Sequence, residues 1–179
     1  ILFILLGDIA DCGNPQSFSV GRSILSLIKT ELNEYTVQFM FTPGNHDLCD
    51  NSFWEFDKFT SEFGFSHNYE NSPAYAYTFD DTNFIFVDSN VHSDHSAPGN
   101  INIAAIRAKV RSDMTNVLFC HHALSQGQGD PHDTIQDSAA LHAKLVDIGI
   151  KFLFHGHTHR ADISNFSNSM LEVGCGSLS

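Results

Sequence analysis

The feature of this sequence that most constrains its fold is a series of short apolar runs that each end in a cluster of polar residues. The runs are Ile1–Leu6, Val37–Phe41, Val117–Cys120 and Lys151–Phe154. Their length and apolar character are typical of strands buried on both faces, as in a parallel sheet. Because amphipathic stretches lie between several of them, the pattern predicts an α/β fold with a largely parallel central sheet.

The segments between these runs carry the signals of helices, namely apolar stripes, caps and glycine stops. The predicted helices are Val20–Leu32, a segment capped by Asn51 or Ser52 and stopped by Gly64, Ile101–Val110, and Ser138–Ile148 followed by Gly149. In the first of them the side chains expected to share one apolar face are Ile24, Leu27, Ile28 and Leu32. In the second they are Phe53, Phe56 and Phe59.

Two further regions indicate antiparallel hairpins. Ala74–Phe79 and Asn83–Val87 flank a short polar turn, and so do Asp162–Phe166 and Met170–Val173. Antiparallel ribbons beside a parallel core favour two mixed sheets packed together with helices outside, an α/β/β/α sandwich. At 179 residues the chain suits one domain, which we place over residues 1–179.

The polar clusters directly follow the four apolar runs. They are Gly7-Asp8-Ile9-Ala10-Asp11, Gly44-Asn45-His46-Asp47, His121-His122 and Gly156-His157-Thr158-His159. Because open α/β sheets bind ligands beyond the carboxyl ends of their strands, these side chains are expected to converge on one rim. A mixed set of Asp, Asn and His suits Mn, Fe or Zn, since it is too rich in nitrogen for a dedicated Ca or Mg site. The sequence therefore predicts a transition-metal site.

Composition excludes several other classes. A formal net charge of −12 argues against nucleic acid or an anionic membrane surface as a partner. No apolar run approaches the ~20 residues needed to cross a bilayer. The four Cys residues are scattered without a CxxC spacing, so zinc-finger and thioredoxin sites are not expected. Two disulfides remain arithmetically open, but free thiols in a cytoplasmic protein are the simpler expectation.

The order of the motifs resembles that of the calcineurin-like metallophosphoesterase family. The family pattern is Asp-x-His, then GDxxD, GNH[DE], a lone His and GHxH. This chain has GDIAD, GNHD, His121 and GHTH, and the resemblance runs from Gly7 to about Ser177. Each motif alone is weak, whereas four in order after successive strands are specific. The resemblance implies a hydrolase that cuts a small-molecule phosphate ester, either a diester or a monoester, with two divalent metal ions.

The same resemblance implies the metal ligands. Asp8 would bridge both ions, because a carboxylate has two oxygens. Asn45, His121 and His157 would complete the second metal site, and His159 would bind the first. Mn is the first candidate for both ions, with Fe, Zn or Ni as alternatives. A metal-bound hydroxide would attack phosphorus in line with the leaving oxygen.

Other motif residues would support the reaction without binding metal. His46 would stand beside the leaving group as a general acid or charge stabiliser, with Asp47 orienting its ring. Asp11 and His122 would lie behind the ligands and orient them. A further group, His92, Asp94 and His95, is predicted to be a surface loop, with a place beside the substrate cleft as the alternative.

One part of the family pattern is missing from this chain. Only six residues precede Gly7, so there is no Asp-x-His to supply two ligands of the first metal. We expect the sequence to be cut at its N-terminus, before a strand that would lie beside Ile1–Leu6, and the C-terminal end is open to the same interpretation. One alternative is a non-catalytic scaffold that has lost the first metal site. Another is a regulatory or toxin-linked module within a longer polypeptide.

Overall fold

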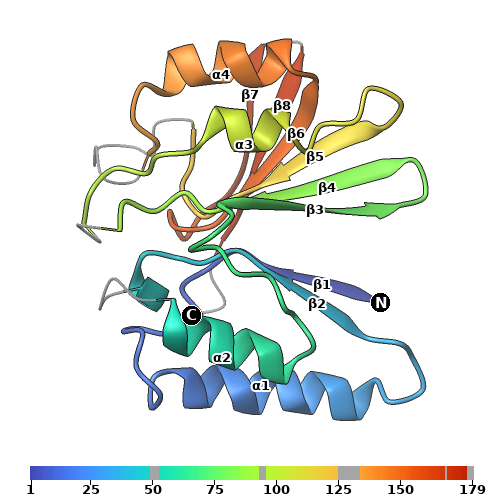
Figure 1. The fold of residues 1–179 in the computed structure, drawn as a ribbon, viewed down its shortest axis with the longest axis vertical. Helices are drawn as coiled ribbons and strands as arrows, with labels where there is room; N and C mark the ends of the chain where they lie inside the picture. Colours follow the sequence, from blue (N-terminus) through green and yellow to red (C-terminus); the bar gives the residue numbers. More distant parts are fainter. Residues whose placement is uncertain (49–52, 93–95, 125–133, 168, 177–179) are drawn as a thin grey trace.

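The computed structural model describes residues 1–48, 53–92, 96–124, 134–167 and 169–176. These residues form four layers, in the order helices, small sheet, large sheet, helices (Figure 1). The predicted α/β/β/α sandwich of two packed sheets is therefore confirmed. Within the described residues no helix is both long enough and apolar enough to cross a membrane.

The small sheet pairs β1 (Leu2–Leu5) with β2 (Gln38–Phe41) in parallel, with Phe3 opposite Phe39. Its outer face is covered by α1 (Phe18–Glu31) and α2 (Trp54–Glu62), as the lower half of Figure 1 shows. A short 3₁₀ helix, η1 (His46–Leu48), lies between β2 and α2.

The large sheet has the strand order β3-β4-β5-β6-β8-β7. Its strands are β3 (Ala74–Phe79), β4 (Thr82–Val87), β5 (Thr115–Phe119), β6 (Ile150–His155), β7 (Ala161–Ser167) and β8 (Met170–Cys175). The inner strands pair in parallel, whereas β3 and β7 pair antiparallel at the two edges, which confirms both predicted hairpins. On the outer face lie α3 (Ile103–Arg107) and α4 (Ser138–Asp147).

Alternation along the strands divides the core into two parts. On β4, Phe84 and Phe86 point toward the small sheet, while Ile85 and Val87 point toward α3 and α4. The inner part is largely aromatic, and Phe119 stacks between Phe86 and Phe154 with ring centroids 4.9 and 5.3 Å away. Such ladders of cross-strand rings add to the stability of neighbouring strands within the large sheet.

The predicted apolar face of α1 was wrong for Ile24 and Leu27, whereas Ile28 packs against the core as expected. Ile24 and Leu27 are 49% and 59% exposed, whereas Phe18, Gly21 and Leu25 are buried. The Phe18 ring stacks on Phe59 of α2 at 4.8 Å. A Cβ on Gly21 would lie 2.6 Å from the Ile9 side chain, so only glycine allows this approach. Close packing at Gly21 therefore sets the rotation of the helix, and the larger apolar residues are turned outward.

The other helices agree more closely with expectation. In α2, Phe56 and Phe59 are buried and Gly64 follows with φ of +84°, as a helix stop requires. The predicted caps Asn51 and Ser52 lie outside the described residues. Gly149 ends α4 in the same way, with φ of +92°. The helix predicted over Ile101–Val110 is shorter, and it begins after Asn102, whose side chain accepts a hydrogen bond from the backbone N–H of Ala105.

A half-buried carboxylate on α2 makes the stability of the fold depend on pH. Burial and the nearby charge of Glu70 raise the pKa of Asp57 to about 6. A folded-state pKa above the unfolded value of 3.8 stabilises the protein at low pH, and this contribution is lost as pH rises through about 6. We predict that Asp57→Asn raises the melting temperature at pH 7.5 and has little effect at pH 4. The gain is at most about 1 kcal/mol, since water screens the side chain. Thermal unfolding at both pH values is the measurement, and an equal gain at both would contradict the explanation.

Candidate metal centre

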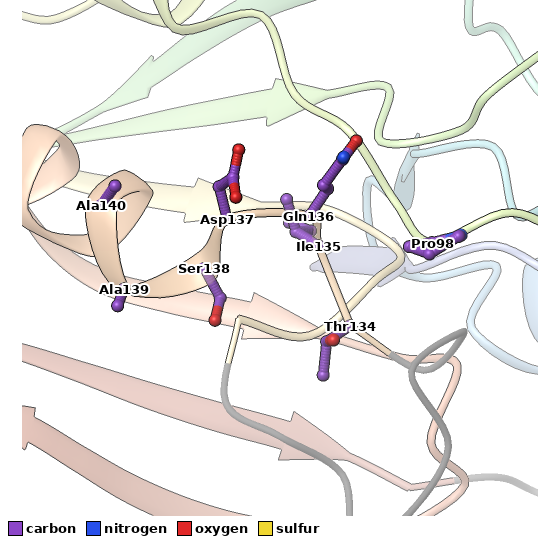
Figure 2. Close-up of a pocket in the computed structure, with 8 residues that line it drawn as sticks. All are labelled: Pro98, Thr134, Ile135, Gln136, Asp137, Ser138, Ala139 and Ala140. Atoms are coloured by element: carbon purple, nitrogen blue, oxygen red, sulfur yellow. The ribbon is translucent and has the colours of Figure 1, made fainter.

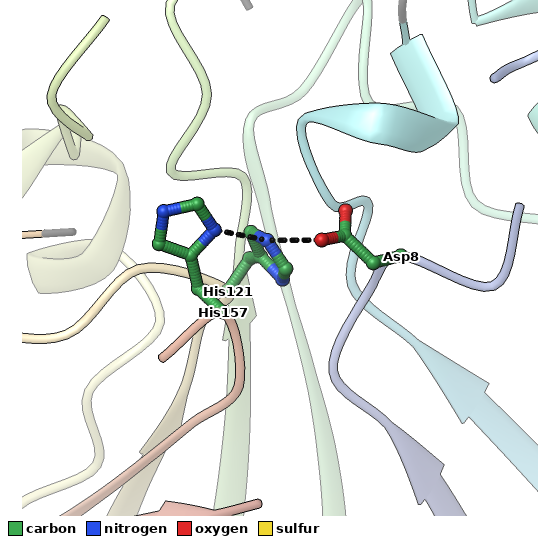
Figure 3. Close-up of side chains that lie close together, drawn as sticks. All are labelled: Asp8, His121 and His157. Carbon is green, nitrogen blue, oxygen red and sulfur yellow. Dashed lines mark hydrogen bonds and ion pairs between the residues drawn. The ribbon is translucent and has the colours of Figure 1, made fainter. Parts of the chain in front are cut away.

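The polar clusters after four strands meet where the two sheets come together. Asp8 and Asn45 follow β1 and β2 of the small sheet, whereas His121 and His157 follow β5 and β6 of the large sheet. Possible ligand atoms of Asp8, His121 and His157 all lie within 4.8 Å of one another (Figure 3). The side chains therefore converge across a seam between two sheets.

The Nε2 atom of His121 lies at the centre of this cluster. It is 3.0 Å from Asn45 Oδ1, 3.0 Å from His157 Nδ1 and 3.3 Å from Asp8 Oδ2. On the other side of the ring, Nδ1 lies 2.6 Å from the backbone carbonyl oxygen of Leu6. A carbonyl oxygen only accepts hydrogen bonds, so Nδ1 carries a proton and donates it to Leu6. When the ring is neutral, Nε2 therefore presents a lone pair to the cluster.

This donor set fits a metal ion. A single proton on His121 Nε2 could satisfy one of the three neighbouring atoms, whereas a cation can bind all of them together with Nε2. Ligand atoms roughly 2.1 Å from a common ion, at angles of about 90° to 110°, lie roughly 3.0 to 3.4 Å apart. The observed separations of 3.0 to 3.3 Å match this spacing.

Charge within the cluster also indicates a place for a cation. Burial opposes ionisation of Asp8, but the charge and hydrogen bond of His121 outweigh it and hold the pKa of Asp8 at about 2. Burial likewise disfavours a charged His121, yet Asp8 raises the pKa of this histidine. The buried carboxylate thus draws positive charge to itself, which a proton on His121 or a divalent ion can supply.

The backbone is strained at the candidate ligands. Asp8, His157 and His159 have φ of +53°, +62° and +55°. This left-handed conformation is uncommon for residues with a side chain and occurs where the surrounding structure imposes it, often at functional sites.

Glycines allow the two loops of the small sheet to touch. A Cβ on Gly44 would lie 2.2 Å from both the backbone nitrogen and Oδ1 of Asp8. A Cβ on Gly7 would lie 2.4 Å from the nitrogen of Gly44 and 2.7 Å from His121 Nδ1. The glycines of the GD and GN motifs are therefore required because another backbone or ligand passes against them.

His46 lies at the edge of the cluster. Its backbone N–H donates to Asp8 Oδ1 at 3.1 Å, and its ring is 44% exposed. Ring atom Nδ1 donates to the backbone carbonyl of Asp11 at 2.9 Å, which orients the ring. The Asp11 carboxylate is fully exposed, and its Oδ1 lies 3.9 Å from the same ring nitrogen, farther away than the backbone carbonyl.

Asp47 does not have the predicted contact with the His46 ring. Its side chain is completely buried, and its two oxygens accept hydrogen bonds from the backbone N–H groups of Ala10 and Gly44, each at 2.9 Å. Burial raises the pKa of Asp47 to about 7, even though both amides favour the charged form. The side chain joins the loops after β1 and β2, and the Asp11 carbonyl takes the place of Asp47 in orienting His46.

The remaining predicted residues lie around the cluster. His121 contributes to it, whereas His122 points to Ser89, with Nδ1 2.9 Å from the hydroxyl oxygen. Burial, together with the charges of His121 and His157, lowers the pKa of His122 well below its usual value. His159 is exposed and lies outside the group of converging ligands found among the described residues.

The loop after β4 contains residues that the sequence analysis missed. Ser89 is completely buried and contacts both histidines after β5, and Asn90 donates to the Pro43 carbonyl oxygen. The strand-end pattern could have found them, because Asn83–Val87 is also an apolar run followed by polar residues. The prediction for this run was limited to a strand of a hairpin. In the same loop, half-exposed His92 pairs with the buried Asp88 at 2.5 Å, and Asp94 and His95 lie outside the described residues.

A separate hollow lies at the start of α4 (Figure 2). It is lined by Pro98 and by residues 134–140 and contains none of the candidate site residues. Among the described residues, Cys12, Cys120 and Cys175 are free thiols.

Comparisons with known structures agree with the fold. The chain is similar in structure to a dimetal phosphatase from Danio rerio, with a TM-score of 0.69 and 15% identity over 97% of this chain and 71% of the other. It is also similar to the phosphopantetheinyl hydrolase of Mycobacterium tuberculosis, with a TM-score of 0.58 and 13% identity over 98% of this chain and 79% of the other. No curated protein sequence matches the chain.

At these identities, the structural likeness establishes the fold alone. The sequence gives the family, because the model of the calcineurin-like phosphoesterases matches residues 1–161. That range contains each of the four strand-end motifs and every candidate ligand described above. This chain therefore belongs to the calcineurin-like phosphoesterase family.

Proposed function

We propose that the protein is a metal-dependent phosphoesterase that hydrolyses a small phosphodiester or phosphomonoester at a binuclear site. The observation that carries the proposal is the convergence of Asp8, Asn45 and His157 on the lone pair of His121 Nε2. The family supports a phosphate ester as the substrate class. The net charge of −12 disfavours a long nucleic acid, because such a substrate needs a basic track along the protein surface.

Each residue of the site has a part in this chemistry. Two bound divalent ions would supply Lewis acidity and an activated water. Asp8, Asn45, His121 and His157 would hold one ion, with His159 and the second oxygen of Asp8 directed to the other. The strained backbone and the hydrogen bonds described above fix these ligands before any ion binds, which lowers the cost of ordering them.

His46 is proposed to act on the leaving group. The bond from its Nδ1 to the Asp11 carbonyl orients the ring, and Nε2 would donate a proton or a hydrogen bond to the leaving oxygen. The backbone N–H of His46 donates to Asp8 Oδ1. This hydrogen bond keeps the proposed acid, His46, next to the proposed metal ligand, Asp8. The two residues have separate roles, since Asp8 binds cations and His46 contacts the substrate.

The first prediction concerns metal binding. Titration with Mn²⁺, followed by elemental analysis after desalting, should show up to two ions per chain. Asp8→Asn should weaken both sites because the carboxylate is proposed to bridge them, whereas His159→Ala should weaken one. His142→Gln on α4 is a matched control, since it removes a histidine outside the site and should leave binding unchanged. Loss confined to one site in Asp8→Asn would refute the bridge, and no binding by the unmodified protein would favour the non-catalytic scaffold.

The second prediction concerns turnover. The Mn²⁺-loaded protein should hydrolyse bis-nitrophenyl phosphate, and a chelator should abolish the activity. His46→Ala should reduce kcat by about 10²- to 10⁴-fold, because general acid catalysis contributes that much. Its metal content should stay near that of the unmodified protein. Emptying of the site in His46→Ala would show that this residue is a ligand, contrary to the assigned role.

A further inference from the structure

The segment Asp88–Asn90 contacts both halves of the metal site. It directly follows β4 of the large sheet, which ends at Val87. Asn90 Nδ2 donates to the carbonyl oxygen of Pro43 at 3.0 Å, in the loop after β2 of the small sheet. Ser89 contacts the two histidines after β5 of the large sheet. One short segment thus joins loops that belong to different sheets.

The hydrogen bonds around Ser89 determine the direction of its hydroxyl proton. Its Oγ lies 3.2 Å from the backbone nitrogen of His121 and 3.1 Å from that of His122, and both N–H groups donate to it. A hydroxyl has two lone pairs and one proton, so the proton is left for His122 Nδ1 at 2.9 Å. His122 therefore accepts at Nδ1 and carries its own proton on Nε2. Ser89 sets the backbone of both histidines and the tautomer of the second.

The side chain of Asn90 is fixed in the same way. Its Nδ2 uses both protons, one toward the Pro43 carbonyl and one toward Asp88 Oδ1 at 2.7 Å. Asp88 is buried and also accepts from the backbone N–H of Asn90 at 3.0 Å. Among the described residues, Asn90 Oδ1 is buried without a hydrogen-bond partner. The two donor contacts alone therefore determine which way the amide points, and the buried acceptor is left unsatisfied.

The groups that Asn90 and Ser89 contact lie next to candidate ligands or belong to them. Pro43 is two residues from Asn45, and Ser89 binds the backbone of His121 itself. The separation between Asn45 Oδ1 and His121 Nε2 is 3.0 Å, yet these atoms come from different sheets. A shift of one sheet against the other by a fraction of an ångström would spoil a shared ion, because metal coordination tolerates only about 0.2 Å.

We propose that Asp88–Asn90 is a positioning brace that holds the Pro43 loop and the His121–His122 pair at the spacing required for one shared metal ion. Ser89 holds the large-sheet end, Asn90 holds the small-sheet end, and Asp88 fixes Asn90. The inference rests on the proposed function, since it concerns the same ion. None of the three residues is assigned as a ligand or a reacting group.

The test is the affinity for Mn²⁺, measured by titration calorimetry on the whole chain. Ser89→Ala removes the hydroxyl with little change of volume, and affinity should fall about 10- to 100-fold, as for other groups that orient ligands. Nitrogen-15 spectra of the histidine rings should show the His122 proton on Nε2 in the unmodified protein and a mixture of tautomers in Ser89→Ala. Ser89→Thr keeps the hydroxyl and should retain the Nε2 tautomer.

Two further variants separate positioning from general destabilisation. Thr60→Val removes another buried hydroxyl, which bonds to Asp57 within α2, and should leave the affinity unchanged. Asn90→Asp keeps the size of the side chain but loses the donor to Pro43, so affinity should fall as in Ser89→Ala. The metal-free melting temperature reports folding of each variant.

The outcomes also distinguish failure of the brace from failure of the proposed function. Unchanged affinity in folded Ser89→Ala and Asn90→Asp, beside an unmodified protein that binds Mn²⁺, would overturn the brace and leave the proposed function intact. An equal fall in affinity for Thr60→Val would also overturn it, because the effect would then follow stability. If the unmodified protein does not bind Mn²⁺, both inferences are wrong.

Discussion

The hydrogen bond from His121 Nδ1 to the Leu6 carbonyl is the interaction on which the site depends. At 2.6 Å it joins the large sheet to the small sheet and decides which nitrogen of the ring faces the cluster. With Nδ1 protonated, Nε2 presents a lone pair to Asp8, Asn45 and His157. Loss of this contact would remove the acceptor of Nδ1 and would let the ring turn. The strand end and the ligand therefore stabilise each other.

The conformation of the site costs free energy, which packing in the rest of the fold offsets. Three candidate ligands have positive φ, and Asp47 is a carboxylate with no exposure to water. Strain of this kind is worth about 1 to 3 kcal/mol for each residue and persists only where packing imposes it. The stacked rings of Phe86, Phe119 and Phe154 supply such packing directly beneath the strand ends. Stability of the aromatic layer and geometry of the site are thus linked.

Sequence patterns predicted the parts of the structure that depend on local chemistry. The strands, both hairpins and the residues after each strand follow from apolar runs, turns and motifs, and the structure has them in the expected places. The face of α1 could not be predicted, because it depends on the contact of Gly21 with Ile9, 12 positions earlier in the chain. The contacts of Asp47 were equally hidden, since Ala10 becomes its partner only after the two loops meet. Long-range packing, rather than local pattern, decides such cases.

The division of the ligands between two sheets explains why residues without metal chemistry matter here. Ligands on a single sheet would inherit their spacing from strand pairing, in which neighbouring strands lie about 4.8 Å apart. Between two sheets no backbone hydrogen bonds fix the distance between the ligands, so contacts of side chains must fix it. The contacts of Leu6 with His121 and of Asn90 with Pro43 join loops of different sheets, which strand pairing leaves independent. A seam of this kind can be adjusted by single substitutions that leave the core unchanged, and the binding geometry can therefore vary separately from the fold.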